Sequence, residues 1–505
     1  MGNIISPLSV SLKHLRTTKS SYASILDRLN TAPGKPVAAP TASAWQSPPA
    51  PLANFCSEEF PTEVDVLIIG SGITACSIAY HLLRQDGPKP RVAIFEAREL
   101  CSGATGRNGG HIKESPYNEW ARLVARFGRI AADEVVRFRM AHLKNLLELA
   151  DKEGLREVSE AREVETVDVY CEPEAWTKAQ QRLREWLDAF PDEKGRWRTW
   201  EGADLKTKFN LTTACGCITS TAGSLSPYAL ITHLYQRLLT TYPTLSLHTN
   251  TPVETLQGTP VDPWRRPISP LQPYSVFTFT GSSATIKATH VVHATNGHVT
   301  RLVPGLKGKL IAARAQMTSQ RLMPEGVGLP GGADRSWSFC WNKGFDYLTI
   351  RPDGAYMLGG GFARGPSEGL EAMGNAKDDE NTIYEAAYLG GLLPAVFQGT
   401  VKGTVIESAW TGTIGFSVDS LPWVGAIPEK VAGGRRRGMG MEWICAGYSG
   451  EGMVNAWGCG RGLAVMLRNE LYKENASTGV PQAMLITEKR VKKATVEMMV
   501  EDYLD

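Results

Sequence analysis

A glycine-rich turn that follows an apolar strand constrains the fold of this chain more than any other feature. Residues 64–69 read VDVLII, a run rich in β-branched side chains that is typical of a buried parallel strand. The turn GSGITA follows and leads into residues 73–84, which have the pattern of a helix. Gly70 suits the tight turn, Gly72 lets the backbone approach a ligand, and Ala75 permits close packing of helix on strand.

The second half of this unit supplies an acidic residue at the expected place. Residues 91–95 (RVAIF) predict another buried strand, and Glu96 follows it, where a carboxylate can bind a ribose hydroxyl. The helix N-terminus at Ile73 and Thr74 offers unpaired N–H groups and partial positive charge to phosphates. Strand, turn, helix, strand and acid in this order predict dinucleotide binding, and the alternative is an ordinary glycine turn in a βαβ unit.

The loop after Glu96, which is rich in glycine and is called the bare loop below, favours FAD over a nicotinamide dinucleotide as the cofactor. Residues 102–110 read SGATGRNGG and have neither helical nor strand periodicity. Such a loop can run alongside an extended FAD and donate backbone N–H groups to it, whereas a simple nicotinamide dehydrogenase would continue its sheet here. The alternative is a flexible surface loop. The expected cofactor contacts, which include side-chain contacts from the Arg and the Asn, are Ser102, Thr105, Arg107, Asn108, Gly109 and Gly110.

Two later segments complete the expected cofactor site. A β-branched strand at 290–294 runs into a turn with Ala294 and Thr295, as in the strand that closes a nucleotide-binding sheet; a simple glycine-ended strand is the alternative. Residues 444–462 predict a strand, a glycine-rich turn and a helix whose N-terminus can face the flavin. In that turn we expect contacts from Gly447, Tyr448, Gly450, Gly452 and Met453.

Composition narrows the class of protein. A chain of 505 residues with 42% hydrophobic and 21% charged residues has room for a large core and two domains. A net charge of +2 gives no reason to expect nucleic acid as a partner. Nine scattered cysteines suit a reducing compartment, so we expect a cytoplasmic protein. The Cys215/Cys217 pair lacks the second pair that a zinc site needs, so we expect no metal.

The sequence predicts little contact with membranes. No apolar run reaches the ~20 residues that cross a bilayer, so we expect no transmembrane segment. The first residues, MGNIIS, match an acylation pattern at Gly2 and Ser6. Myristoylation of Gly2 would give only a weak membrane contact, because a single acyl chain anchors marginally.

The chain divides by pattern into an arm and two interleaved domains. Residues 1–60 are rich in Pro, Ser, Thr and Ala and predict a largely irregular arm, with a short helix within 11–30, that lies on the body or is loose in solvent. We expect one helix from 116 to about 151 and another at 378–393. The expected segments are 61–160, 216–304 and 403–505 for a cofactor-binding domain with a C-terminal tail, and 161–215 and 305–402 for a substrate domain.

With these four elements in this order, the sequence resembles the D-amino-acid-oxidase-like FAD-dependent oxidoreductases over about residues 62–470. It is most similar to the γ-glutamylputrescine oxidoreductase-like branch, through the motifs at 102–110 and 447–452. The resemblance implies an α/β protein with a discontinuous Rossmann-type FAD-binding domain and an α+β substrate domain built on a mostly antiparallel sheet. It also implies oxidation of a C–N bond in a small amine or amino acid by hydride transfer to flavin N5.

Three positions depart from the family pattern. Glu451 stands where the family often has His. Met357 stands where sarcosine-oxidase-like relatives have a Lys that assists the reaction with oxygen, and Ser408 stands near the Cys that attaches their flavin. We therefore expect noncovalent FAD and leave open whether oxygen is the electron acceptor.

Tyr347, Trp410 and Glu451 are the candidate catalytic residues. The Tyr347 hydroxyl could bind substrate and either ring could hold an amine, although ordinary strand packing is the alternative for each ring. His111 could lie near the flavin rim, but a loop histidine without a redox role is favoured. Arg351 could bind a carboxylate, but its Arg-Pro-Asp-Gly turn favours a side chain in water.

Two other functions compete with amine oxidation at this stage. One is a flavin-dependent monooxygenase or another FAD enzyme of a biosynthetic pathway. The other is a catalytically silent FAD-binding protein that interacts through its long arm. Reduction of the flavin by amines, by NAD(P)H alone, or by neither would separate the three.

Overall fold

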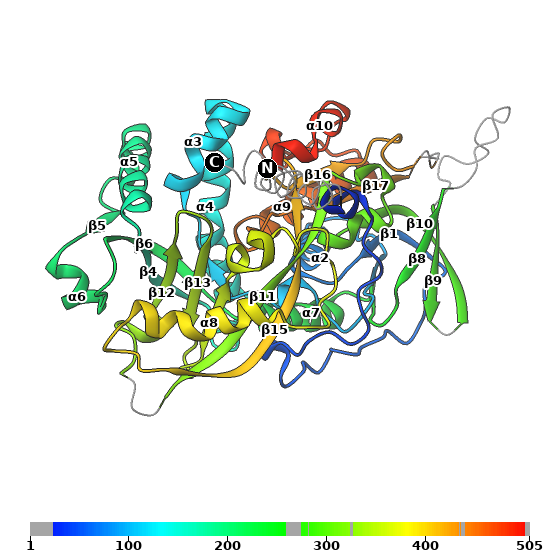
Figure 1. Ribbon diagram of the computed structural model, residues 1–505. Helices are drawn as coiled ribbons and strands as arrows, with labels where there is room; N and C mark the ends of the chain where they lie inside the picture. The colour runs from blue at the N-terminus through cyan, green and yellow to red at the C-terminus, as the bar shows by residue number, and fades with distance from the viewer. Residues whose placement is uncertain are drawn as a thin grey trace, which may run out of the picture.

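A computed structural model describes residues 24–258, 274–280, 282–323, 327–433, 435 and 440–499. Its strands form two sheets that lie side by side, with helices packed around them (Figure 1). The acylation pattern at Gly2 lies outside the described residues. Every helix of the described chain is too short or too polar to cross a membrane. The same residues contain no group of His, Cys, Asp and Glu side chains placed to hold a metal ion.

The first sheet is a parallel sheet with antiparallel additions. Its central order is β17-β10-β1-β2-β7, and all these neighbours are parallel. Antiparallel strands join this sheet at two places: β16 pairs with β17 at one edge, and β9, which also pairs with β8, pairs with the first half of β10. The bounds are β1 (Glu63–Ile69), β2 (Val92–Phe95), β7 (Leu245–His248), β8 (Val253–Gln257), β9 (Tyr274–Thr280), β10 (Ser282–His293), β16 (Trp423–Ala426) and β17 (Met441–Ala446).

The centre of this sheet is buried on both faces, as the sequence predicts. Val66, Leu67 and Ile68 of β1 are fully buried, because helices cover one face and further chain covers the other. Helix α2 (Ile73–Arg84) packs on α9 (Ala456–Tyr472). At Gly460 of α9 a Cβ would lie 2.7 Å from the Ser77 Cβ, so a larger residue would push the two helices apart.

The second sheet is mostly antiparallel. Its order is β15-β11-β14-β13-β12-β4-β6-β3, with β5 on β6, and β12 with β4 is its parallel pair. Its strands are β3 (His111–Ile112), β4 (Arg162–Tyr170), β5 (Arg198–Trp200), β6 (Gly216–Ser224), β11 (Leu310–Leu322), β12 (Arg335–Cys340), β13 (Phe345–Ile350), β14 (Tyr356–Gly360) and β15 (Thr404–Ser417). The two sheets together give the α/β class with a Rossmann-type unit and an α+β substrate unit, as expected.

Strand membership differs from the expected domain segments at three strands. Strands β3, β6 and β15 belong to the second sheet, although they lie within the segments 61–160, 216–304 and 403–505 expected for the cofactor domain. A β-rich stretch in the sequence does not specify the partner strand. Strand β15 pairs with β11 along its whole length, so the chain crosses back to the first sheet only after Ser417.

Helices cover both sheets. In Figure 1, α8 crosses in front of β11 and β15, and α3 and α5 stand beyond the far end of the second sheet. The bounds are α3 (Pro116–Phe127), α4 (Arg129–Lys152), α5 (Pro173–Ala189), α6 (Ala203–Phe209), α7 (Pro227–Thr241), α8 (Ile383–Val396) and α10 (Glu488–Lys493).

Two helix predictions need correction. The single helix expected from 116 to about 151 is two helices, because Gly128 has φ +84° and ends α3. The helix expected at 378–393 begins at Ile383, because the carboxylate of Asp378 is held in a buried ion pair with Arg98 instead of facing a helix surface.

The described part of the arm lies on the body, which was one of the two arrangements expected. Residues 24–30 are helical, and residues 31–60 contain little regular structure beyond the short turn η1 (Ala44–Gln46). Trp45 is nevertheless almost fully buried. The arm is therefore part of the packed structure from this point onward.

Candidate cofactor-binding site

Four predicted segments meet at one edge of the first sheet. Ile69 of β1 lies opposite Phe95 of β2 and His293 of β10, so the residues after these strands emerge together. The Gly70 N–H donates to the Phe95 carbonyl at 2.8 Å, and the Ala294 N–H donates to the Ile69 carbonyl at 3.0 Å. Carboxyl ends of parallel strands are where nucleotides bind in open α/β sheets. We call the turns after β1, β2, β10 and β17 the cofactor edge.

Gly70 is required at the centre of the cofactor edge. Its φ is +102°, and a Cβ there would lie 2.7 Å from the Ala294 carbonyl oxygen. Both the backbone conformation and the close approach therefore exclude a side chain. The glycine role predicted from GSGITA is thus matched by its local geometry.

The N-terminus of α2 faces the same edge. Its N-cap is Gly72, which has no side chain to cap the helix. The Ile73 N–H donates to Thr105 Oγ1 at 3.0 Å, which ties the helix to the bare loop. Thr74 Oγ1 lies 2.7 Å from the hydroxyl of Tyr448, which joins the helix to the last glycine-rich turn. Partial positive charge at this helix end favours a phosphate nearby.

Glu96 lies at the expected position, with its carboxylate on the first turn. Its Oε2 accepts from the Ser71 N–H at 3.0 Å and from the Ser71 hydroxyl at 2.7 Å. Its Oε1 accepts from the Arg98 N–H at 3.1 Å. The carboxylate therefore also holds two turns of the cofactor edge together.

The bare loop 102–110 bends around the short turn η2 (Ala104–Gly106). Its two polar long side chains are used inside the protein. Arg107 donates from Nη1 to the Thr411 carbonyl at 2.6 Å, and from Nε to the Ser102 carbonyl at 2.9 Å. Asn108 Oδ1 accepts from the Gly110 N–H at 2.7 Å, so this side chain shapes its own loop. Backbone groups of the loop, more than these side chains, are left to meet a cofactor.

The residues present fit FAD by two independent features. Ser102 Oγ and Thr295 Oγ1 are buried yet have no hydrogen-bond partner in the protein, although both stand at predicted contact positions. Such orphaned hydroxyls call for a polar partner, which ribose and phosphate groups can supply. Around the glycines Gly103, Gly450 and Gly452, the place of a Cβ has no other atom within 4 Å, so the backbone there faces open space.

The second sheet contributes the candidate catalytic tyrosine. A Cβ on Gly109 would lie 2.6 Å from Cε2 of Tyr347, so the ring packs directly on the bare loop. Its hydroxyl donates to Met317 Sδ at 3.2 Å, a weak acceptor, and burial raises its pKa. Tyr347 therefore stays protonated and retains the capacity to bind a substrate.

Trp410 is placed differently from the expectation for a substrate-binding ring. It is fully buried, and its Nε1 donates to the Arg107 carbonyl at 2.9 Å. This geometry makes Trp410 a support of the bare loop from behind. Met453 and Tyr448 are also buried, in the turn that carries Glu451.

Glu451 lies in a group of buried charges that the sequence did not reveal. We call Lys113, Glu114, Arg139 and Glu451 the charged wall. Arg139 and Glu114 side chains are only 2% and 5% exposed and approach to 3.8 Å. Arg139 Nε and Nη1 and Glu114 Oε1 nevertheless have no hydrogen-bond partner. Glu114, Arg139, Ile112 and Val454 help to line a small hollow.

Burial favours the protonated form of the two carboxyl groups in the charged wall. It raises the pKa of Glu114 to about 8, against the opposing charge of Arg139. It also raises the pKa of Glu451, and Arg139 again opposes the shift. Lys113 donates to Asp168 and, at 2.7 Å, to Ser338 Oγ, so its charge is already paired. Lys113 and Glu114 follow the bare loop directly, which was the available signal, whereas Arg139 comes from α4 with no local motif.

Three other residues considered from the sequence have the following surroundings. Arg351 forms the predicted turn, but its side chain pairs with Glu160 at 2.6 Å and lies over the Trp45 ring instead of pointing into water. Met357 is fully buried in β14. The Nε2 of His111 is buried without a partner, and burial lowers the pKa of His111 well below its usual value.

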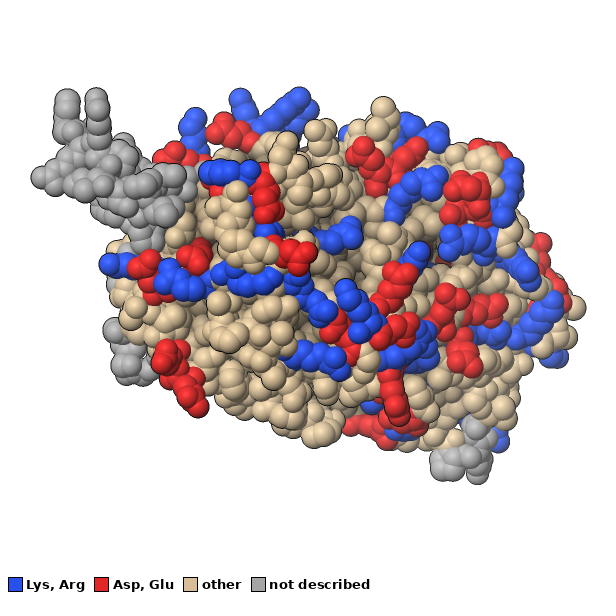
Figure 2. Space-filling view, turned by 180° about the vertical axis from the view of Figure 1, so that it is seen from behind, with Lys and Arg blue, Asp and Glu red and all other residues tan. Residues whose placement is uncertain are grey.

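The face of the molecule drawn in Figure 2 shows no large area of a single charge sign. Figure 2 shows basic and acidic side chains interspersed over one face.

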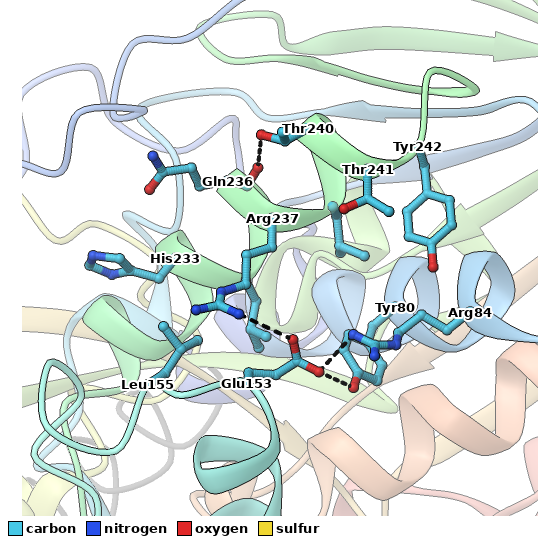
Figure 3. Close-up of a pocket in the computed structure, with 12 residues that line it drawn as sticks. Tyr80, Arg84, Glu153, Leu155, His233, Gln236, Arg237, Thr240, Thr241 and Tyr242 are labelled. Atoms are coloured by element: carbon cyan, nitrogen blue, oxygen red, sulfur yellow. Dashed lines mark hydrogen bonds and ion pairs between the residues drawn. The ribbon is translucent and has the colours of Figure 1, made fainter.

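A separate hollow of about 610 Å³ lies between α2, the end of α4 and α7 (Figure 3). There Glu153 accepts from the Tyr80 hydroxyl and from Arg84 Nη1, each at 2.6 Å. Its central carboxylate is therefore satisfied, and the hollow holds none of the predicted site residues.

Comparison with known proteins gives one family and one fold. The family described as FAD dependent oxidoreductase (DAO) matches residues 65–466. Glycine oxidase from Geobacillus kaustophilus is 17% identical, with 85% of this chain and 99% of that chain covered and a TM-score of 0.61. L-amino acid deaminase from Proteus vulgaris, without its specific insertion sequence, is 16% identical, with coverages of 87% and 98% and a TM-score of 0.58.

Iminodiacetate oxidase from Chelativorans sp. BNC1 is also similar, at 16% identity, coverages of 81% and 96%, and a TM-score of 0.57. At these identities the solved structures show the common fold. No curated protein sequence matches the chain. The family match spans the βαβ turn, the bare loop, the strand at 290–294 and the whole last glycine-rich segment at 444–462. The chain therefore belongs to the DAO family of FAD dependent oxidoreductases.

Proposed function

We propose that this enzyme oxidises a C–N bond of a small amine or amino acid and holds its FAD noncovalently. The observation that carries the proposal is the packing of Tyr347 on the bare loop, next to Ser338, its partner on β12, which binds Lys113 of the charged wall. Bound FAD supplies the acceptor for the hydride that leaves the carbon next to nitrogen. Similar folds named glycine oxidase, L-amino acid deaminase and iminodiacetate oxidase support this class of substrate.

The cofactor is proposed to lie along the cofactor edge. The N-terminus of α2, whose N-cap is a glycine, and the bare loop would hold its phosphates, and Glu96 would bind a ribose. Ser102 and Thr295 would give their unpaired hydroxyls to it. Ser408 lacks the thiol that a covalent flavin bond needs, which supports noncovalent attachment.

The protein's own groups would bind and deprotonate the substrate. Tyr347 keeps its proton and can donate a hydrogen bond to a substrate atom. Glu451 stands on the glycine-rich turn, where it can accept the proton that an ammonium substrate must lose before its C–H bond reacts. Glu114, with a pKa of about 8, holds a proton at neutral pH and leaves Arg139 to balance Glu451.

Two finer assignments are part of the proposal. The nine free cysteines support a cytoplasmic location. The motifs at 102–110 and 447–452 support the γ-glutamylputrescine oxidoreductase-like branch. Because Met357 stands in place of a lysine, the proposal covers both an oxidase, which reduces oxygen, and a dehydrogenase, which uses another electron acceptor.

An anaerobic reduction experiment tests the function. The purified yellow protein is mixed without oxygen with polyamines, N-methyl amino acids and D-amino acids, and the visible absorbance of the flavin is followed. Rapid bleaching by one of these compounds is the expected result. Bleaching by NAD(P)H alone would favour the monooxygenase, and bleaching by neither would favour the silent binding protein. Acid precipitation should release the flavin, and colour retained by the precipitate would contradict noncovalent binding.

A further inference from the structure

We propose that residues 41–45 of the arm form part of the cofactor site. We call them the strap. They hold the bare loop in the shape that binds FAD, so that release of the strap loosens the cofactor. The inference rests on the FAD assignment and is independent of which substrate is oxidised.

The strap binds consecutive parts of the bare loop. Ser43 Oγ donates to the Gly106 carbonyl at 2.7 Å, and Trp45 Nε1 donates to the Asn108 carbonyl at 2.6 Å. Both strap residues are buried. The partners are 63 residues apart in the sequence, so no local turn accounts for the contact.

The carbonyl between these two is held as well. The Arg107 carbonyl accepts from Trp410 Nε1 at 2.9 Å, and Arg107 Nη2 returns a hydrogen bond to the Thr41 carbonyl at 2.7 Å. Three successive carbonyls of the loop therefore bind indole or hydroxyl donors. A trans peptide directs its N–H opposite to its carbonyl, so this arrangement turns the N–H groups of Asn108 and Gly109 away from these donors. N–H groups so directed are what an anionic cofactor requires.

A buried ion pair lies under the strap. Arg98 donates to Asp378 at 2.9 Å and to the Ser102 carbonyl at 3.2 Å. The Arg107 guanidinium lies 3.5 Å from the same carboxylate. Arg98 Nη1 also binds the Val37 carbonyl of the arm at 3.2 Å. Loss of the arm would expose the ion pair between Arg98 and Asp378 to water. Arg98 and Arg107 both bind the bare loop directly, so the loop would lose part of its support.

Other parts of the arm make contacts of a different kind. Lys35 pairs with Glu254 at the surface, where ion pairs contribute little. Ser57 Oγ accepts from the Leu247 N–H at 3.0 Å, at the edge strand β7. The strap is therefore distinguished from the rest of the arm by its partners, which belong to the cofactor loop.

FAD titration of strap variants tests the proposal. Apoprotein is titrated with FAD while flavin fluorescence is followed, for the wild type, Ser43→Ala and Trp45→Phe. Each variant removes one donor to the loop and retains most of the packing. We expect the Kd for FAD to rise about fivefold in each, as for the loss of one hydrogen bond.

Two matched variants serve as controls. Ser57→Ala removes an arm hydroxyl that binds β7, and Trp120→Phe removes an indole donor to Asp133 on the helices α3 and α4. Both should leave the FAD Kd unchanged even if they lower thermal stability. Equal FAD affinity in all four variants would overturn the strap, as would weakening that follows thermal stability alone.

A measurement on the wild type keeps the proposal testable if a variant does not fold. Because coupling is reciprocal, FAD should slow amide hydrogen exchange in the strap. We expect protection of residues 41–45 and of the bare loop together when FAD is added to apoprotein, with little change around Ser57. The same rate of amide hydrogen exchange in residues 41–45 with and without FAD would overturn the proposal. A wild-type protein that takes up no FAD would overturn the strap together with the cofactor assignment, whereas failure to oxidise amines would leave the strap standing.

Discussion

The cofactor edge and the charged wall share Glu451, in the turn after β17, but they are built from different groups. The cofactor edge uses backbone: Gly70 and Gly447 have positive φ, and the N-cap of α2 is Gly72. The charged wall uses side chains, with Glu114 and Arg139 almost fully buried. The cofactor edge should therefore lose its FAD affinity when a side chain is added to one of its glycines. The charged wall should instead respond to a change in the charge of its side chains or in pH.

The largest effect is expected from one added methyl group at the cofactor edge. In Gly70→Ala the new Cβ would lie 2.7 Å from the Ala294 carbonyl, at a φ of +102°. The chain must shift, and the strain should raise the FAD Kd by at least about a hundredfold or prevent folding. Flavin content after purification and FAD titration measure this. Gly34→Ala is the matched control, since nothing lies within 4 Å of its added Cβ.

The same difference explains what could be predicted from sequence. Strands β1 and β2 and the turn at Gly70 are specified by neighbours in the sequence, because β-branched runs and glycines act locally. Trp45 and Arg139 were missed, since each acts on residues distant in the chain. The end of α3 at Gly128 could not be predicted either, because a single glycine inside a helical pattern is often tolerated.

Side-chain partners were the hardest part of the site to predict. Arg107 was expected to meet the cofactor, and its guanidinium instead binds carbonyls of Ser102, Thr411 and the arm. Trp410 was expected over the substrate and supports the loop. A residue type indicates which chemistry is available, but only the fold decides whether a protein group has already used it.

The second-largest effect is expected at the charged wall, in the pH dependence of the free energy of unfolding. The pKa of Glu114 is raised from 4.5 to about 8 on folding, so between these values the folded protein binds more protons than the unfolded one. Stability should therefore fall as pH rises from about 5 to 8, by up to about 1.4 kcal/mol per pH unit from this group. Glu114→Gln should flatten this slope in denaturant unfolding curves. A slope that the substitution leaves unchanged would contradict the assignment of a protonated Glu114.

A smaller effect separates substrate binding from cofactor binding. Tyr347→Phe removes a hydroxyl whose present partner, Met317 Sδ, is a weak acceptor. The rate of flavin reduction by the best amine should fall about tenfold, while the FAD Kd stays the same. Tyr388→Phe is the control, because its hydroxyl binds Asp346 at 2.7 Å within the same part of the molecule. Weaker FAD binding in Tyr347→Phe without a change in reduction rate would move Tyr347 to the cofactor side of the comparison.

The smallest effect tests the few side chains that the cofactor edge does use. Ser102 Oγ is buried and has no protein partner, so Ser102→Ala removes nothing that the apoprotein needs. The apoprotein should keep its melting temperature, while the FAD Kd rises about fivefold through one lost hydrogen bond. Ser159→Ala should give the opposite result, a lower melting temperature with an unchanged FAD Kd, because the Ser159 hydroxyl donates to the Leu155 carbonyl at 2.7 Å within the protein. If both substitutions changed only the melting temperature, the orphaned hydroxyl would be a packing feature and the cofactor edge would bind FAD through backbone groups alone.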